Sequence, residues 1–183
     1  MKIAAIGRGN VGGGCAGLWR AAGHEVVEIG REGGDASSAE CVLLAVPSGE
    51  IASALENVTG LEGTPVIDAT NLLRGDRPQG FDSLAEYVQS LTGGPVAKAF
   101  NANFAVLYDR LGDARAAPSM VYAADDEARE ATEQLIRDAG YEPVFAGGLD
   151  RARAVEDFLG ILFAVNHAGM GPFWYRFAPA DVF

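Results

Sequence analysis

The pattern Gly7-x-Gly9-x-x-Gly12 stands near the start of the chain, between a short apolar run and a helical pattern. The run Lys2–Ile6 is apolar without alternation, as in a parallel strand that is covered on both faces. Asn10–Ala22 repeats apolar residues at helical spacing, and Glu25–Ile29 is a second strand pattern. A strand, a glycine turn, a helix and a strand within about 30 residues are typical of a dinucleotide-binding unit.

Each glycine of this pattern has a physical role in such a unit. Gly7 permits the tight turn, Gly9 lets the backbone approach a pyrophosphate, and Gly12 lets the helix pack closely on the strands. The N–H groups at the start of the helix then face the phosphates. The alternative is a glycine-rich turn in a sheet protein that has lost its ligand. The predicted cofactor-binding residues of the turn are Gly7, Arg8, Gly9, Asn10, Val11 and Gly12.

The residues after the second strand favour NADP over NAD. NAD-binding proteins usually carry an acid at the tip of this strand, for the ribose hydroxyls. Here the tip is followed by Gly30 and Arg31, and a guanidinium suits a 2′-phosphate. Glu28 and Glu32 are the competing acids, and a solvated surface charge is the alternative for Arg31. We expect NADP, with NAD the less favoured cofactor.

The rest of the chain alternates strand and helix patterns, which predicts an α/β fold with a Rossmann-like, mostly parallel sheet. Gly30–Glu40 is rich in Gly, Ser and Asp and is too short for a full helix and a further strand, so the fold is shortened after the second strand. The later strands are expected at Cys41–Val46, Pro65–Asp68, Pro95–Phe100, Ser119–Ala123 and Glu142–Phe145. The later helices are expected at Gly49–Asn57 with Ser48 as N-cap, at Ser83–Leu91 with a capping box, in part of Asn101–Leu111, at Ala128–Ala139, and at Leu149–His167 as a long C-terminal helix.

Two parts of the chain follow from this pattern. Residues 1–148 are expected to form the NADP-binding Rossmann-like domain. Residues 149–183 add the long helix and an aromatic tail with Phe173, Trp174, Tyr175 and Phe177. We expect this part to pack on the same domain or on a partner, since clustered aromatic residues usually mark contacts. A homodimer is the expected assembly.

Composition narrows the classes of function. The chain has 14 Lys and Arg against 25 Asp and Glu, a net charge of −11, which argues against nucleic acid as a partner. Two Cys and two His without ligand spacing argue against a metal site, and Cys15 and Cys41 are expected to be buried thiols. No apolar run reaches about 18 residues, so no membrane contact is expected. The chain begins on a strand without a leader pattern, so we expect a cytoplasmic protein that binds a small molecule.

Several segments, in this order, resemble the F420-dependent NADP oxidoreductase family, whose N-terminal fold is shared with the NADP domain of STEAP-type metalloreductases. The resemblance covers nearly the whole chain. It rests on MKIAAIGRGNVGGG, GHEVVEIGR, CVLLAVP, VIDATN, DSLAEY, VAKAFNANF, the AADDEA run, and the closing helix that ends in Gly-Met-Gly.

The resemblance implies hydride transfer between NADPH and a second flat redox partner, either the deazaflavin F420 or a flavin. A small organic acceptor that is reduced directly is a further hypothesis. By position, NADP would be lined by Gly7, Arg8, Gly9, Asn10, Val11, Gly30 and Arg31, and flanked by Ala45, Val46 and Pro47. Asn71 and Ala99 would lie near the nicotinamide, and Asn101, Asn103 and Gly169–Gly171 would bound the second ring.

The chain departs from the family at three places. Gly30 replaces a serine of a Ser-Arg pair, the segment between Arg31 and Cys41 is shorter, and Asn101 and Asn103 stand where the archaeal enzymes have a histidine and an aliphatic residue. These departures keep open a rival hypothesis, a non-catalytic NAD(P)-binding module or redox sensor.

Single polar residues also have alternative interpretations. His167 is expected to interact with the dipole at the end of the long helix, and the alternative is a proton donor or a ring contact beside the substrate. Lys98 is expected to be structural or phosphate-facing, and Asp68 to cap a turn rather than act as an acid or base. Direct hydride transfer needs no nucleophile, which agrees with a sequence that shows no catalytic constellation.

Overall fold

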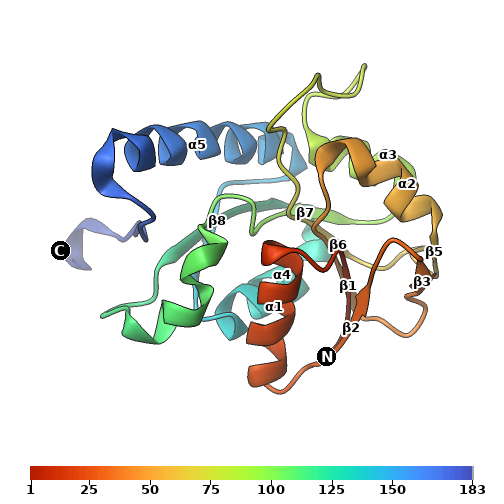
Figure 1. Ribbon diagram of the computed structural model, residues 1–183, viewed down its shortest axis with the longest axis horizontal. Helices are drawn as coiled ribbons and strands as arrows, with labels where there is room; N and C mark the ends of the chain where they lie inside the picture. Colours follow the sequence, from red (N-terminus) through yellow and green to blue (C-terminus); the bar gives the residue numbers. More distant parts are fainter. Residues whose placement is uncertain (183) are drawn as a thin grey trace.

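The computed structural model describes residues 1–182, and its first elements form the predicted unit (Figure 1). Strand β1 (Lys2–Ile6) leads through the glycine turn into helix α1 (Asn10–Ala21), and β2 (Glu25–Ile29) returns beside β1 in parallel register. All but one residue of β1 is buried, which explains why its sequence shows no alternation of apolar and polar residues.

The central sheet has seven strands in the order β2-β1-β4-β6-β7-β8-β9. Neighbouring strands run parallel except for β7 and β8, which are antiparallel. The predicted mostly parallel Rossmann-like sheet is therefore confirmed. The remaining strands of this sheet are β4 (Cys41–Leu44), β6 (Val66–Asp68), β7 (Val96–Lys98), β8 (Ser119–Ala124) and β9 (Glu142–Phe145).

Helices cover both faces of the sheet and bury one apolar cluster on each (Figure 1). On one face, Trp19 of α1 and Leu135 of α4 (Asp126–Asp138) share a cluster with Tyr108 of a 3₁₀ helix (Ala105–Asp113). The other face is covered by α2 (Ile51–Glu56), α3 (Leu84–Thr92) and α5 (Ala152–Val165). The result is a three-layer sandwich whose loops carry the polar chemistry.

The segment after β2 is short, as predicted, but it does contain a strand. The two-residue strand β3 (Gly34–Asp35) pairs in parallel with β5 (Val58–Thr59) outside the central sheet. Neither strand was predicted from the sequence, because a pairing of two residues leaves no periodic pattern.

Three predicted boundaries need correction. The strand predicted for Cys41–Val46 ends at Leu44, and the strand predicted for Pro95–Phe100 covers only Val96–Lys98. Phe100 takes a left-handed backbone conformation with φ of 61°, which turns the chain out of the sheet. Ser48 does not cap the second helix: it begins a 3₁₀ turn (Ser48–Glu50), and its side chain accepts no capping hydrogen bond.

The capping box predicted at the start of α3 is confirmed. The Ser83 hydroxyl accepts a hydrogen bond from the Glu86 amide at 3.1 Å, and the Glu86 carboxylate accepts one from the Ser83 amide at 3.3 Å. Two orphan donors at the helix start are thus satisfied.

The aromatic tail lies against α5 and strand β8 of the same chain. Helix α5 is preceded by a 3₁₀ turn (Leu149–Arg151) and followed by a π-helical turn (Asn166–Met170). The Ser119 amide donates to the Tyr175 carbonyl at 2.9 Å, and the Phe177 amide donates to the Ser119 hydroxyl at 2.8 Å. Among the described residues, no helix has the length and apolarity that crossing a membrane requires.

Candidate functional site

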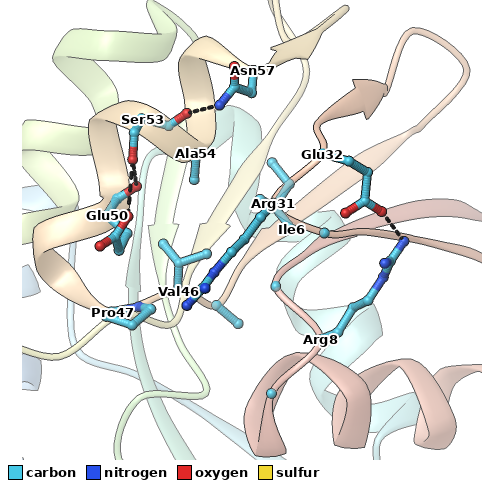
Figure 2. A pocket seen from close by; sticks show the side chains of 14 residues that line it. Ile6, Arg8, Arg31, Glu32, Val46, Pro47, Glu50, Ser53, Ala54 and Asn57 are labelled. Atoms are coloured by element: carbon cyan, nitrogen blue, oxygen red, sulfur yellow. Dashed lines mark hydrogen bonds and ion pairs between the residues drawn. The ribbon is translucent and has the colours of Figure 1, made fainter.

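A cleft of about 710 Å³ opens at the carboxyl ends of the first strands of the sheet. Loops after β1, β2 and β4 line three sides of it, and α2 lines the fourth (Figure 2). Following the chain, β2 is added on one side of β1 and β4 on the other side, so the direction in which the sheet grows changes at β1. Ligands of open α/β sheets bind at such switch points, and this volume is in the usual range of roughly 300–1,000 Å³.

The glycine turn forms the floor of the cleft, and its three glycines behave differently. Gly7 has a positive φ of 105°, and a Cβ there would collide with the Ala45 carbonyl oxygen. A Cβ at Gly12 would collide with the Gly7 carbonyl oxygen, so α1 packs directly on the turn. A Cβ at Gly9 would meet no atom within 4 Å. The structure therefore needs Gly7 and Gly12 for its own packing, whereas the space at Gly9 is open to a ligand.

The first turn of α1 has no capping side chain and no acidic residue, and its N-cap is Gly9. In contrast, α3 begins with a capping box, and α4 has Asp126 and Glu127 in its first turn. The N–H groups at the start of α1 thus remain available, and the helix dipole favours an anion there. Asn10, Val11 and Gly12 belong to this turn and are not among the side chains that line the cleft, so their predicted part in cofactor binding falls to their backbone amides.

Basic and acidic side chains meet at the side of the cleft formed after β2. The Arg8 guanidinium lies 2.7 Å from the Glu32 carboxylate and donates to the Glu28 carbonyl at 2.9 Å. Hydrogen bonding from its own backbone amide, together with the charge of Arg8, holds the pKa of the Glu32 carboxyl below its usual range. Arg31 extends into the cleft (Figure 2) and forms no ion pair in the part of the chain that the structure describes.

The wall opposite the arginines comes from α2 and the turn before it, and the sequence analysis missed it. Its residues follow the spacing i, i+3, i+4 and i+7, so they share one helical face. The Ser53 hydroxyl donates to the Glu50 carbonyl at 3.1 Å, and the Asn57 side-chain amide donates to the Ser53 carbonyl at 2.9 Å. This helical spacing, in the helix that follows the strand after the glycine-containing unit, could have predicted the wall. The wall residues are Glu50, Ser53, Ala54 and Asn57.

Eight predicted cofactor-binding residues thus come together around one cleft. They are Gly7, Arg8, Gly9, Gly30, Arg31, Ala45, Val46 and Pro47. The further lining residues are Ile6, Glu32 and the four residues of the α2 wall.

The residues predicted near the nicotinamide and the second ring lie outside this cleft. The Asn71 side-chain amide donates to the Asn101 carbonyl at 2.8 Å, so the segments after β6 and β7 are joined. Ala99 is fully buried beside them, and Asn103 donates instead to the Ser119 carbonyl at 3.2 Å. The His167 ring stacks on Phe163 with centroids 6.1 Å apart. No hydrogen bond among residues 1–182 joins Asn103 or His167 to the pair of Asn71 and Asn101.

A buried charged network lies below this edge of the sheet. Lys98 is fully buried, and its Nζ donates to Asp68 and to the Thr70 carbonyl, each at 2.7 Å. Glu156 of α5 lies 3.3 Å from the same Nζ and accepts from Arg77 at 3.1 Å. These two cations and two carboxylates neutralise one another. The structural role expected for Lys98 is therefore the correct one, and its phosphate-facing alternative is wrong.

A metal site is not part of this arrangement: within the described range, no three His, Cys, Asp or Glu side chains cluster as metal ligands would.

Comparison with known proteins extends the similarity to the whole chain. No model of a known protein family and no curated protein matches the sequence. A protein from Arthrobacter sp. FB24, described as a candidate F420-dependent NADP reductase, has a TM-score of 0.81 and 25% identity over 98% of this chain and 100% of its own. A hypothetical protein from Sinorhizobium meliloti has a TM-score of 0.61 and 24% identity over 97% of this chain and 90% of its own.

More distant similarity reaches enzymes that bind NADPH. A reductive aminase from Aspergillus terreus, in complex with NADPH and ethyl levulinate, has a TM-score of 0.66 and 14% identity over 93% of this chain and 62% of its own. At this identity the similarity concerns the fold alone. The resemblance to the F420-dependent NADP reductases is thereby confirmed, and the fold is that of NADP-dependent oxidoreductases.

Proposed function

We propose that the protein is an NADP(H)-dependent oxidoreductase that transfers hydride between NADPH and a deazaflavin, a flavin or a small organic acceptor. One observation supports this proposal above the others. An open glycine turn, an uncapped helix N-terminus and two arginines meet in a single cleft at the switch point of the sheet. This combination suits a pyrophosphate together with a second phosphate.

The residues of the cleft fit the parts of this dinucleotide. The turn around Gly9 and the first amides of α1 would hold the pyrophosphate, because a side chain is absent where the phosphates must approach. Arg8 and Arg31 would bind the 2′-phosphate through charge-assisted hydrogen bonds. The segment Ala45–Pro47 and the α2 wall would enclose the adenosine.

The bound nicotinamide would supply the hydride chemistry, and the chain would orient the two reactants and exclude water. Asn71 and Asn101 stand at the sheet edge toward which the nicotinamide half would extend, and Ala99, which directly follows β7, is fully buried. Asn103, His167 and Gly169–Gly171 are proposed to bound the second ring. Neutral amides are compatible with a transfer that needs no nucleophile.

The proposal is tested by calorimetry and by turnover. We expect heat of binding with NADPH, and loss of the near-ultraviolet absorbance of NADPH when F420, FMN or FAD is added. Absence of binding heat at millimolar NADPH and NADH would overturn the proposal. Oxidation with one of the three acceptors would identify the partner.

The assignment of NADP rests on Arg31 and has its own test. Replacement Arg31→Ala removes a charge-assisted contact to the 2′-phosphate, so we expect NADPH affinity to fall by roughly 10- to 100-fold and NADH affinity to change little. Equal losses for both dinucleotides would remove Arg31 from this role.

A second candidate function, a non-catalytic dinucleotide-binding module or redox sensor, is favoured by one observation. The cleft ends before Asn71, Ala99 and Asn101, so its walls enclose the proposed adenosine half and no second ring. Tight NADPH binding without turnover with F420, FMN, FAD and small carbonyl compounds would favour the module over the enzyme.

We further propose that the protein forms a homodimer through the outer side of α5. Ile161 is 62% exposed on this helix, and Met170 just beyond it is 65% exposed. Light scattering after size exclusion should give twice the mass of one chain, and the Ile161→Glu variant should give the mass of a single chain.

A further inference from the structure

Glu32 is the acidic side chain that contacts an arginine of the cleft. Its carboxylate lies 2.7 Å from the Arg8 guanidinium, and both side chains are more than half exposed. Arg8 is also held by the Glu28 carbonyl, so its position does not depend on Glu32 alone. The pair lies at the mouth of the cleft, where the residues after β1 and β2 meet.

Gly30 provides the space for this ion pair. A Cβ built at Gly30 would lie 2.5 Å from the Glu32 Oε2 atom and 2.7 Å from an Arg8 nitrogen. Any side chain at position 30 would therefore displace the pair. Arg31, the next residue, extends into the same cleft and has no carboxylate partner among the described side chains.

These contacts leave an anion beside one of the two arginines that a phosphate would need. We propose that Glu32 is a residue that determines specificity between NADPH and NADH. In the free protein its carboxylate pairs with the Arg8 guanidinium, and the 2′-phosphate of NADP(H) must replace this carboxylate. This inference rests on the proposed function, since it concerns the same cleft.

The exchange has opposite consequences for the two dinucleotides. A carboxylate that stays near Arg8 repels a phosphate dianion a few ångströms away, and this repulsion lowers the affinity for NADPH. NADH carries hydroxyls at the same place, and these can donate hydrogen bonds to a carboxylate. Glu32 thus narrows the preference for NADPH that Arg8 and Arg31 create.

The test compares Glu32→Gln with the intact protein by calorimetry against NADPH and NADH. Loss of the carboxylate should tighten NADPH binding by about three- to ten-fold and leave NADH binding unchanged or weaker. Glu28→Gln is the matched control, because it removes one negative charge from the same strand end. Glu28 pairs with Arg20 at 2.7 Å and does not line the cleft, so the control should leave the ratio of the two affinities unchanged.

Two outcomes would overturn the inference. The first is an unchanged ratio of the NADPH and NADH affinities in Glu32→Gln, whether neither affinity changes or both rise equally, and the second is the same shift of this ratio in Glu28→Gln. Each of these leaves the proposed function intact, because the intact protein still binds NADPH. Failure of the intact protein to bind either dinucleotide would overturn both proposals. Thermal unfolding of each variant checks that the fold is retained.

Discussion

Lys98 shows how a single buried charge can be structural in a protein with a net charge of −11. Its ammonium group is surrounded by Asp68, Glu156 and the Thr70 carbonyl, and it has no exposed surface. A buried ion is tolerated only where partners replace its hydration shell. The network joins strands β6 and β7 to helix α5, so Lys98 holds three elements together.

Replacement of Lys98 by Met should therefore destabilise the protein strongly. The methionine has a similar length but leaves two buried carboxylates without their shared cation, which typically costs about 3–5 kcal/mol. Urea unfolding would measure this loss. Arg153→Met is the matched control, since Arg153 pairs with Asp157 on the exposed side of α5 and its loss should have little effect. Similar midpoints for both variants would contradict the structural role of Lys98.

At the scale of elements, α3 and the turn before α2 show that the same residue type acts differently in different places. Ser83 and Ser48 both precede helical segments. Ser83 has an extended backbone conformation that brings its hydroxyl to the Glu86 amide, whereas Ser48 is the first residue of a 3₁₀ turn whose N-cap is Pro47. Backbone conformation therefore decides which serine can cap.

Ser83→Ala should lower the free energy of unfolding by about 1 kcal/mol, because the Glu86 amide loses its partner. Ser48→Ala removes the same hydroxyl where no cap exists and should leave stability unchanged. Chemical denaturation of both variants gives the comparison. An equal loss in the two would mean that the hydroxyl contributes through something other than capping.

In the turn between β1 and α1, Gly12 is needed for packing, whereas Gly9 leaves space for a ligand. Gly12→Ala forces a methyl group into the Gly7 carbonyl and should cost roughly 1–3 kcal/mol of stability. Gly9→Ala places a methyl group in open space and should change stability by less than about 1 kcal/mol. It should nevertheless weaken NADPH binding at least about ten-fold, because the backbone can no longer approach the pyrophosphate.

Thermal unfolding and NADPH calorimetry on the same two samples measure these effects. Unchanged NADPH affinity in Gly9→Ala would show that the phosphates do not contact the turn. A stable Gly12→Ala protein would show that α1 can move away from β1.

At the scale of the whole molecule, both thiols lie in one apolar cluster between the sheet and the layer that contains α1 and α4. Cys15 and Cys41 are fully buried, and this burial raises the pKa of each thiol to about 12. The thiolate is the reactive form, so neither residue can react at neutral pH while the sandwich is closed.

We therefore expect both thiols to resist a disulfide reagent in the native protein and to react together when the protein unfolds. The rate of labelling should rise with urea in parallel with the loss of circular dichroism. Rapid labelling of either thiol in native buffer would show that the α1 layer opens locally.

The sequence by itself determined the features that depend on near neighbours in the chain. The βαβ unit, the glycine turn and the Ser83 cap are each encoded within a few residues, because hydrogen bonds and steric limits of the backbone act over that range. Buried strands such as Cys41–Leu44 were also visible, because strands that are covered on both faces are mostly apolar.

The tertiary structure decided the features that join distant residues. Glu32 meets Arg8 across 24 positions, Lys98 meets Glu156 across 58, and Ser119 meets Tyr175 across 56. Likewise, α2 became a wall of the cleft only because β4 lies beside β1. No local pattern marks such pairs, since the free energy that selects them comes from closing the whole sheet and burying both of its faces.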